Sequence, residues 1–342
     1  MRLFYYSVTN NFGDKMNAWL WPRLLGDIIK DVSDTRLVGI GSLIKSDLSK
    51  VPGRKVIFGT GSGYGPMPLP EEVTDWSVYC VRGPLTAHLL GLPASASIVD
   101  AAWLIDSIPE LKYGACERKG TVFVPHWTTD AYANWQLPCK IAGIRYISPM
   151  AEGHEVLAGI AGAKLAIVES LHGAIIADYY RVPWIPVATD GRVLSFKWLD
   201  FCMSVGVDFR PIRLPGTDLI EQLLERRRCS DADTIEYLDI PPAEFFSEVP
   251  RGASAPATAS YRLKLQLKAA ARPFRAGAVA KLQAFRDTAL LRHTYKNRAE
   301  RLAALLTLIT LENPTLSSDS TRSDKLEQIT LKLEQLRKDY RP

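Results

Sequence analysis

The chain has little cysteine and lacks the long apolar runs of a membrane span. Its 342 residues include five widely spaced cysteines and no Cys-x-x-Cys pair, so we expect neither a zinc site nor a disulfide framework. A reducing cytoplasm is therefore the expected compartment. No run of 18 apolar residues occurs, and no transmembrane helix is expected. Residues 1–14 have no continuous apolar segment followed by a cleavage site, and we expect no signal peptide.

Two common nucleotide-binding motifs are also missing. The segment Gly59-Thr60-Gly61-Ser62-Gly63 has neither the Gly-x-Gly-x-x-Gly spacing of a dinucleotide site nor the Gly-Lys-Ser/Thr ending of a phosphate-binding loop. Closely spaced glycines do allow a ligand to approach the backbone. Two interpretations of this segment stay open, a flexible substrate loop and a plain connection.

Negative charge is scarce in one late segment. Residues 251–302 contain 12 Lys and Arg against 2 Asp and Glu, whereas the first 250 residues carry a net charge of −5. A basic segment with interleaved apolar residues is typical of helices that lie on an anionic membrane surface. Packing against the acidic remainder of the chain explains the same pattern equally well. Nucleic-acid binding is a weaker third interpretation, and we expect no nucleic-acid partner.

Apolar runs alternate with helical patterns over the first 247 residues. Buried strands are predicted at 3–8, 56–58, 78–81, 121–124, 164–168 and 184–187, and helices at 16–25, 83–90 and 173–180. This alternation favours parallel sheets and the α/β class. Because a polar stretch at 112–120 interrupts the pattern, we expect two sheets with a cleft between them. The predicted domains are 1–112 and 113–247, and a linker and a basic, helical C-terminal extension follow over 248–342.

The end of the chain carries a short apolar stripe. Leu326, Ile329, Leu333 and Leu336 follow a 3-4-3 spacing that covers less than two heptads. Coiled coils usually need three to four heptads. We therefore expect a helix that packs against the chain's own body.

Polar side chains follow several predicted strands, where ligands bind in open α/β sheets. Arg82 stands between a strand and a helix start, so it is suited to grip a carboxylate or phosphate, although a surface salt bridge is the alternative. His172 and His126 hold similar positions, and an imidazole with an ordinary pKa near ~6.5 suits proton transfer. A structural hydrogen bond is the alternative for both histidines.

The turn from Asn11 to Asp14 precedes the first predicted helix. Exposed N–H groups at such a turn suit an anion or a sugar hydroxyl. Capping of the helix by Asp14 is an equally good explanation.

Taken together, these segments resemble the polysaccharide pyruvyltransferase family, and most closely the bacterial exopolysaccharide ketal-pyruvyltransferases of the succinoglycan type. The resemblance covers roughly residues 1–200, and the chain after about 250 contributes nothing to it. Many relatives carry an arginine where this chain has Ser170, so one anion contact is either missing or supplied by another cation, for which Arg192 and Lys197 are the candidates. The matching segments are Asn11–Asp14, Gly59–Gly63, Val81–Thr86, Asp100, Val124–His126 and Ser170–Ile175.

The resemblance implies two Rossmann-like domains arranged as in GT-B glycosyltransferases, with the active site in the cleft. It implies phosphoenolpyruvate as the donor substrate, no cofactor and no metal. The acceptor would be a sugar of a lipid-linked exopolysaccharide repeat unit, converted to a pyruvate ketal at the cytoplasmic face of the membrane. The basic residues 251–302 would then make peripheral contact with anionic lipid.

The resemblance also implies roles for particular residues. His172 is expected to be the general acid and base, and Arg82 to bind an anionic group of the donor. Asp14 or Asp190 is expected to hold acceptor hydroxyls. The expected substrate contacts are Asn11, Gly13, Asp14, Gly61, Ser62, Gly63, His126, Ser170, Leu171 and Gly173.

Two other classes of function stay open. One is a nucleotide-sugar glycosyltransferase of the same fold that acts in exopolysaccharide synthesis. The other is a non-catalytic scaffold whose basic segment recruits an assembly complex to the membrane. Arg82 and His172 argue against a pure scaffold, because scaffolding needs neither side chain.

Overall fold

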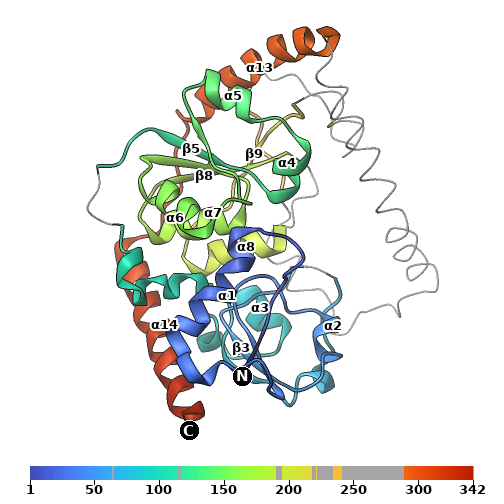
Figure 1. Ribbon diagram of the computed structural model, residues 1–342, viewed down its shortest axis with the longest axis vertical. Helices are drawn as coiled ribbons and strands as arrows, with labels where there is room; N and C mark the ends of the chain where they lie inside the picture. The colour runs from blue at the N-terminus through green and yellow to red at the C-terminus, as the bar shows by residue number, and fades with distance from the viewer. Residues whose placement is uncertain are drawn as a thin grey trace, which may run out of the picture.

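Two parallel sheets organise the chain (Figure 1). The computed structural model describes residues 1–63, 65–113, 117–189, 195–217, 221, 234–240 and 289–341. The first sheet has the order β1 (Arg2–Phe4), β2 (Thr35–Val38), β3 (Arg54–Phe58) and β4 (Ser77–Cys80). The second has the order β6 (Arg145–Tyr146), β5 (Thr121–Val124), β7 (Leu165–Val168), β8 (Trp184–Ala188) and β9 (Ile212–Arg213).

All strand pairs in both sheets are parallel, which confirms the α/β class. The two sheets agree with the expectation of two Rossmann-like halves. The GT-B likeness and the division at 112 and 247 stay predictions. The structure also adds β2, β6 and β9, which the sequence patterns did not indicate.

The helices connect successive strands and cover the sheets. Among the described residues up to 204, the helices are α1 (Phe12–Leu25), α2 (Ser46–Ser49), α3 (Pro84–Leu89), α4 (Trp127–Tyr132), α5 (Gln136–Ile141), α6 (Gly153–Ala161), α7 (Leu171–Tyr179) and α8 (Ser195–Ser204). Two longer helices close the chain, α13 (Ala289–Ile309) and α14 (Asp319–Tyr340). A 3₁₀ helix at Ala101–Ser107 follows Asp100, whose Oδ1 accepts a hydrogen bond from Ala102 N (2.9 Å).

One hydrophobic core joins the two sheets. It includes Phe12 of α1, Trp103 of the first half and Val168 of β7, all fully buried. Phe12 N donates to Pro149 O (2.8 Å), and Trp103 Nε1 donates to Ile175 O (3.1 Å). α8 belongs to the second half but packs against α3 of the first. These contacts hold the carboxyl ends of the two sheets next to each other.

The last two helices pack on different halves (Figure 1). Leu306 of α13 is buried with Ile185 and Val187 of the second sheet. α14 lies against the first half, where Tyr79 Oη donates to Asp339 Oδ2 (2.6 Å). The apolar stripe of α14 packs on the chain's own core, as expected, through Ile329, Leu333 and Leu336.

Most of the basic segment, from residue 251 to 288, lies outside the described residues. No helix in the described part of the chain is long and apolar enough to cross a bilayer.

The strand order of the second sheet reverses between β5 and β7. The chain passes from β5 to β6 on one side and then returns to β7 on the other. In open α/β sheets such a reversal opens a crevice at the carboxyl ends of the strands, where ligands bind. His126 follows β5 and His172 follows β7, so both histidines stand at this point.

Candidate functional site

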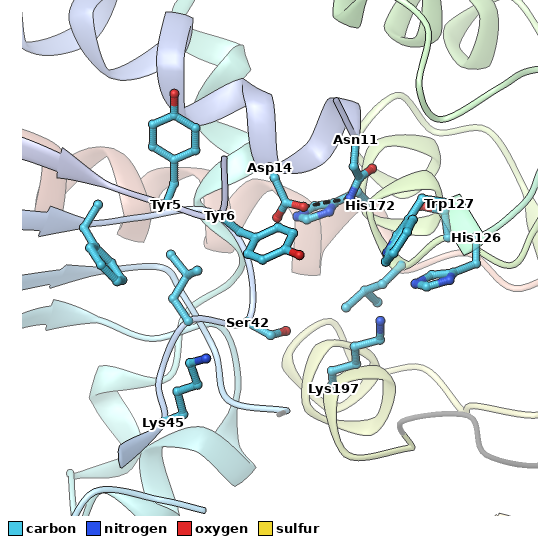
Figure 2. Close-up of a pocket in the computed structure, with 14 residues that line it drawn as sticks. Tyr5, Tyr6, Asn11, Asp14, Ser42, Lys45, His126, Trp127, His172 and Lys197 are labelled. Atoms are coloured by element: carbon cyan, nitrogen blue, oxygen red, sulfur yellow. Dashed lines mark hydrogen bonds between the residues drawn. The ribbon is translucent and has the colours of Figure 1, made fainter. Parts of the chain in front are cut away.

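A cavity of about 380 Å³ lies where the carboxyl ends of the two sheets meet (Figure 2). Its wall comes from the end of β1 and the loop after it, from the loop after β2, from the starts of α1, α4 and α7, and from α8. The residues of the wall are Phe4, Tyr5, Tyr6, Asn11, Asp14, Ser42, Leu43, Lys45, His126, Trp127, Ser170, Leu171, His172 and Lys197.

His172 lies in the first turn of α7 and is 9% exposed. Burial, with smaller contributions from the nearby positive charges of Lys197 and Arg82, lowers the pKa of the His172 imidazole to about 3. The ring is therefore neutral at physiological pH, and its lowered pKa makes it a weak base on its own. Its Nε2 atom is buried and has no hydrogen-bond partner within the described part of the chain.

Gly13 makes room for the His172 ring. A Cβ atom at this position would lie only 2.0 Å from His172 Nδ1, so a larger residue would displace the imidazole. Gly13 is thus placed as a support for the candidate base rather than on the cavity wall. The start of α1 and the start of α7 meet at this contact.

Asp14 lies beside His172 in the first turn of α1 (Figure 2). Asn11 Nδ2 donates to Asp14 Oδ2 (2.9 Å). Burial raises the pKa of the Asp14 carboxyl to about 6, although the bond from Asn11 and the charge of Lys197 act in the opposite direction. A carboxyl group with this pKa exchanges protons near neutral pH.

Ser170 caps helix α7. Its Oγ accepts a hydrogen bond from Gly173 N (3.3 Å), which satisfies one of the free N–H groups of the first turn. Leu171 contributes to the cavity wall, whereas Gly173 packs closely against Val124 and Val168. Ser170 thus has a structural role as a helix cap, at the position where the family resemblance led us to expect a cation.

His126 caps helix α4. Its Nδ1 accepts a hydrogen bond from Thr128 N (3.4 Å), and its backbone N donates to Glu169 Oε2 (3.0 Å). Trp127, the first residue of α4, follows it on the wall. The cap fixes the direction in which α4 leaves β5.

Two lysines supply positive charge to the wall. Lys197 comes from α8 and is 9% exposed, and Figure 2 shows its amino group pointing into the cavity from the side opposite Asp14 and His172. Lys45 follows β2, and its Nζ lies 3.7 Å from Asp47 Oδ2. Lys197 is one of the two cations expected in place of the missing arginine. The other, Arg192, lies outside the described residues, as does Asp190.

Arg82 lies behind the wall and is 1% exposed. Its Nε donates to Asp200 Oδ2 (3.1 Å), its Nη1 to Ser42 Oγ (2.9 Å) and its Nη2 to Ser62 O (2.7 Å). Only Ser42 of these partners reaches the cavity. A direct contact between Arg82 and a donor anion stays a prediction.

The glycine-rich loop surrounds the Arg82 guanidinium. A Cβ atom on Gly61 would lie 2.3 Å from Arg82 Nη2, and Ser62 N donates to Thr86 Oγ1 (3.1 Å). Gly63 approaches the Cβ of Lys197. Of the described residues, these three support the wall from behind rather than form it. A contact of Gly61, Ser62 and Gly63 with substrate stays a prediction.

The structure thus brings six of the predicted site residues to one wall: Asn11, Asp14, His126, Ser170, Leu171 and His172. The sequence analysis did not predict several residues of the wall, among them Tyr5, Tyr6, Ser42, Lys45 and Trp127. These five all follow the ends of strands, which was the available signal. Ser42 and Lys45 could not be found in this way because β2 had not been recognised. No group of three or more metal-binding side chains is present among the residues that the structure describes.

Comparison with known proteins gives one clear relative. The chain is 36% identical over 229 residues to the succinoglycan biosynthesis protein ExoV of Rhizobium meliloti (strain 1021), which covers 67% of this chain and 72% of ExoV. The chain belongs to the succinoglycan-type polysaccharide pyruvyltransferase family. No family model matches it, and no solved structure matches it. In this pyruvyltransferase-family chain, the segments Asn11–Asp14, Val124–His126 and Ser170–Ile175 contribute residues to the cavity wall, and Gly59–Gly63 contacts Arg82 behind it.

Proposed function

We propose that the chain acts in exopolysaccharide biosynthesis as a ketal-pyruvyltransferase. Phosphoenolpyruvate is the proposed donor, and a sugar of a lipid-linked repeat unit is the proposed acceptor. One observation carries the proposal: a cavity in a member of this family sets the neutral imidazole of His172 and the carboxyl group of Asp14 opposite the cation Lys197. The proposed reaction needs no metal and no cofactor.

The donor is an anion at both ends, with a carboxylate and a phosphate. Lys197 and Lys45 are the proposed partners of these groups, and the Ser42 hydroxyl is a further donor on the same wall. When the anionic donor binds next to Lys197, it offsets the positive charge of this lysine, which is one of the contributions that lower the pKa of His172. The donor therefore makes His172 a stronger base as it binds.

Ketal formation moves two hydroxyl protons. C3 of phosphoenolpyruvate takes one proton, which gives C2 positive character, and an acceptor hydroxyl forms a bond to C2. His172 takes the proton of that hydroxyl. The bond from C2 to the phosphate oxygen then breaks, and the second hydroxyl closes the ring on C2. The two hydroxyl protons are balanced by the one gained at C3 and the one that leaves with phosphate.

Asp14 is the proposed holder of an acceptor hydroxyl. Its ionised carboxylate accepts hydrogen bonds, and Asn11 fixes its orientation. Because its pKa is about 6, this role requires a pH above that value. The acidic side of the rate profile should therefore report on Asp14.

A direct assay tests the function. The protein is incubated with phosphoenolpyruvate and a panel of oligosaccharides, and phosphate release and product mass are measured. We expect a product heavier by one pyruvate less one water. Transfer of a sugar from a UDP- or GDP-sugar, with no consumption of phosphoenolpyruvate, would instead establish a glycosyltransferase.

Peripheral contact of residues 251–302 with anionic lipid on the cytoplasmic face is part of the proposal. Their excess of basic residues supports it. Co-sedimentation of the full chain with vesicles of anionic lipid, compared with vesicles of neutral lipid, tests it. Equal binding to the two kinds of vesicle would contradict an electrostatic contact.

Replacing Lys197 with methionine tests the donor site. We expect the KM for phosphoenolpyruvate to rise about tenfold or more, because a charge-assisted hydrogen bond is lost, while arginine at this position restores part of the affinity. Lys50→Met is the matched control, since Lys50 is exposed and paired with Asp47. An unchanged KM in the folded Lys197 variant would remove this lysine from the donor site.

Asp14→Asn should separate activity from stability. The folded pKa of about 6 lies above the usual value of about 4, so the ionised carboxylate destabilises the fold as pH rises through 6. The asparagine variant should therefore gain about 3 kcal/mol in the free energy of unfolding at pH 8, less at pH 4.5, and lose turnover. Urea unfolding at both pH values measures this, with the exposed Asp31→Asn as control. A gain that does not depend on pH would contradict the raised pKa.

A further inference from the structure

Aromatic side chains gather on the cavity wall although aromatics make up only 9% of the chain. Tyr6, from the loop after β1, is 40% exposed. Trp127 is half-buried at the start of α4. Figure 2 shows the two rings facing the cavity from opposite sides, Tyr6 from the first half of the chain and Trp127 from the second.

Core packing does not account for these two rings. The described residues form three hydrophobic clusters, and neither Tyr6 nor Trp127 belongs to one of them. The Trp127 ring packs instead on His126, with centroids 5.8 Å apart. Apolar ring surface next to water is unfavourable in the free protein, and a ligand that covers it gains this free energy.

The groups around the two rings define what such a ligand must present. Asp14 and the neutral His172 lie on one side and accept hydrogen bonds, whereas Lys197 lies on the other side and suits an anion. A pyranose ring has an apolar face of C–H groups and hydroxyl donors around its edge. This combination fits a site with an aromatic face and hydrogen-bond acceptors at one edge.

We propose that Tyr6 and Trp127 form the acceptor subsite, a slot that takes one pyranose ring with its C–H face on Trp127 and its reacting hydroxyls toward Asp14 and His172. The inference rests on the proposed function and deepens it by assigning the residues that select the acceptor. The cavity volume of about 380 Å³ is near the lower end of the range for ligand sites. That size favours one sugar ring beside a three-carbon donor over a whole nucleotide sugar.

Saturation-transfer NMR tests the slot with methyl β-D-galactopyranoside and methyl β-D-glucopyranoside as probes. In the wild-type protein, saturation should reach the C–H protons of at least one of these sugars. Trp127→Ala should weaken that sugar's binding about tenfold or more through loss of buried apolar area, and Trp127→Phe should retain most of it. Affinity for phosphoenolpyruvate, measured on the same samples, should be unchanged in both variants.

Trp19→Ala is the matched control. Trp19 is also partly exposed, but its ring stacks on His154 outside the cavity wall. It should leave sugar binding unchanged.

Three results would overturn the proposal. The first is that neither sugar binds to the wild-type protein, and the second is that the sugar binds equally well to the Trp127→Ala variant. The third is that uridine binds to the wild-type protein where the sugars do not, and that the Trp127→Ala variant loses this uridine binding. Failure of the proposed function gives a different pattern. The sugar would then still bind in a Trp127-dependent manner, but pyruvate would not be transferred to any acceptor.

Discussion

Replacing His172 with alanine should lower kcat by about 10²–10⁴-fold, the usual contribution of a positioned acid or base. The imidazole is buried, neutral and placed on the cavity wall, and it can take the hydroxyl proton once the negative charge of the bound donor raises its pKa. Alanine removes the proton acceptor but leaves Lys197 and Lys45 in the site. Phosphoenolpyruvate should therefore still bind, and the loss should fall on turnover. Steady-state kinetics and donor titration together measure both effects.

The size of the His172 ring makes a second variant necessary. Gly13 packs directly under the imidazole, so alanine leaves a gap that can disturb the start of α1. His172→Asn keeps much of the volume and cannot act as a base near neutral pH, and it should lose turnover to a similar extent. His154→Ala, at an exposed histidine stacked on Trp19, is the control. Near wild-type turnover in either His172 variant would end its assignment as the base.

Much of this site could be predicted because carboxyl ends of parallel strands meet at one edge of a sheet. The apolar runs before Arg82, His126 and His172 marked three strands, and strand ends in such folds are where ligands bind. The histidines and Asp14 do meet at the cavity. Arg82 stands at the same edge but points into protein rather than into the cavity.

The remaining part of the wall could not be predicted for identifiable reasons. β2 begins with Thr35 and Arg36, and two polar residues before two apolar ones give no clear strand pattern. Without β2, nothing placed Ser42 or Lys45 at a strand end. Trp127 was missed because a single aromatic residue after a strand is equally typical of a buried core and of a binding surface.

Long-range partners were beyond sequence reasoning altogether. Arg82 pairs with Asp200, which is 118 residues away in α8. A basic residue at a strand end shows which ligands it suits but not which protein group neutralises it. The glycine-rich loop is a second example, because the need for Gly61 becomes evident only when the guanidinium lies against it.

The Arg82→Ala variant should lose about 3–5 kcal/mol in the free energy of unfolding. Arg82 and Asp200 are 1% and 0% exposed and form a buried ion pair between the two halves of the chain. Removing the guanidinium leaves the Asp200 carboxylate buried without its counter-charge, which is the costly way to break such a pair. Urea unfolding measures the loss, and Arg54→Ala, at an exposed position of β3, is the control. A loss below about 1 kcal/mol would contradict a stabilising role of the Arg82–Asp200 ion pair.

Two further measurements decide what Arg82 does. Asp200 also accepts hydrogen bonds from Thr86 N (2.9 Å) and Thr86 Oγ1 (2.7 Å), so removing both charged partners should cost less than the sum of the single losses but should not restore full stability. Donor affinity in the folded fraction then separates the two roles. If Arg82 itself binds the donor, affinity for phosphoenolpyruvate falls in Arg82→Ala beyond the loss in Asp200→Asn. If Arg82 acts by holding Ser42 and α8 in place, the two variants lose donor affinity together, because α8 carries both Asp200 and Lys197.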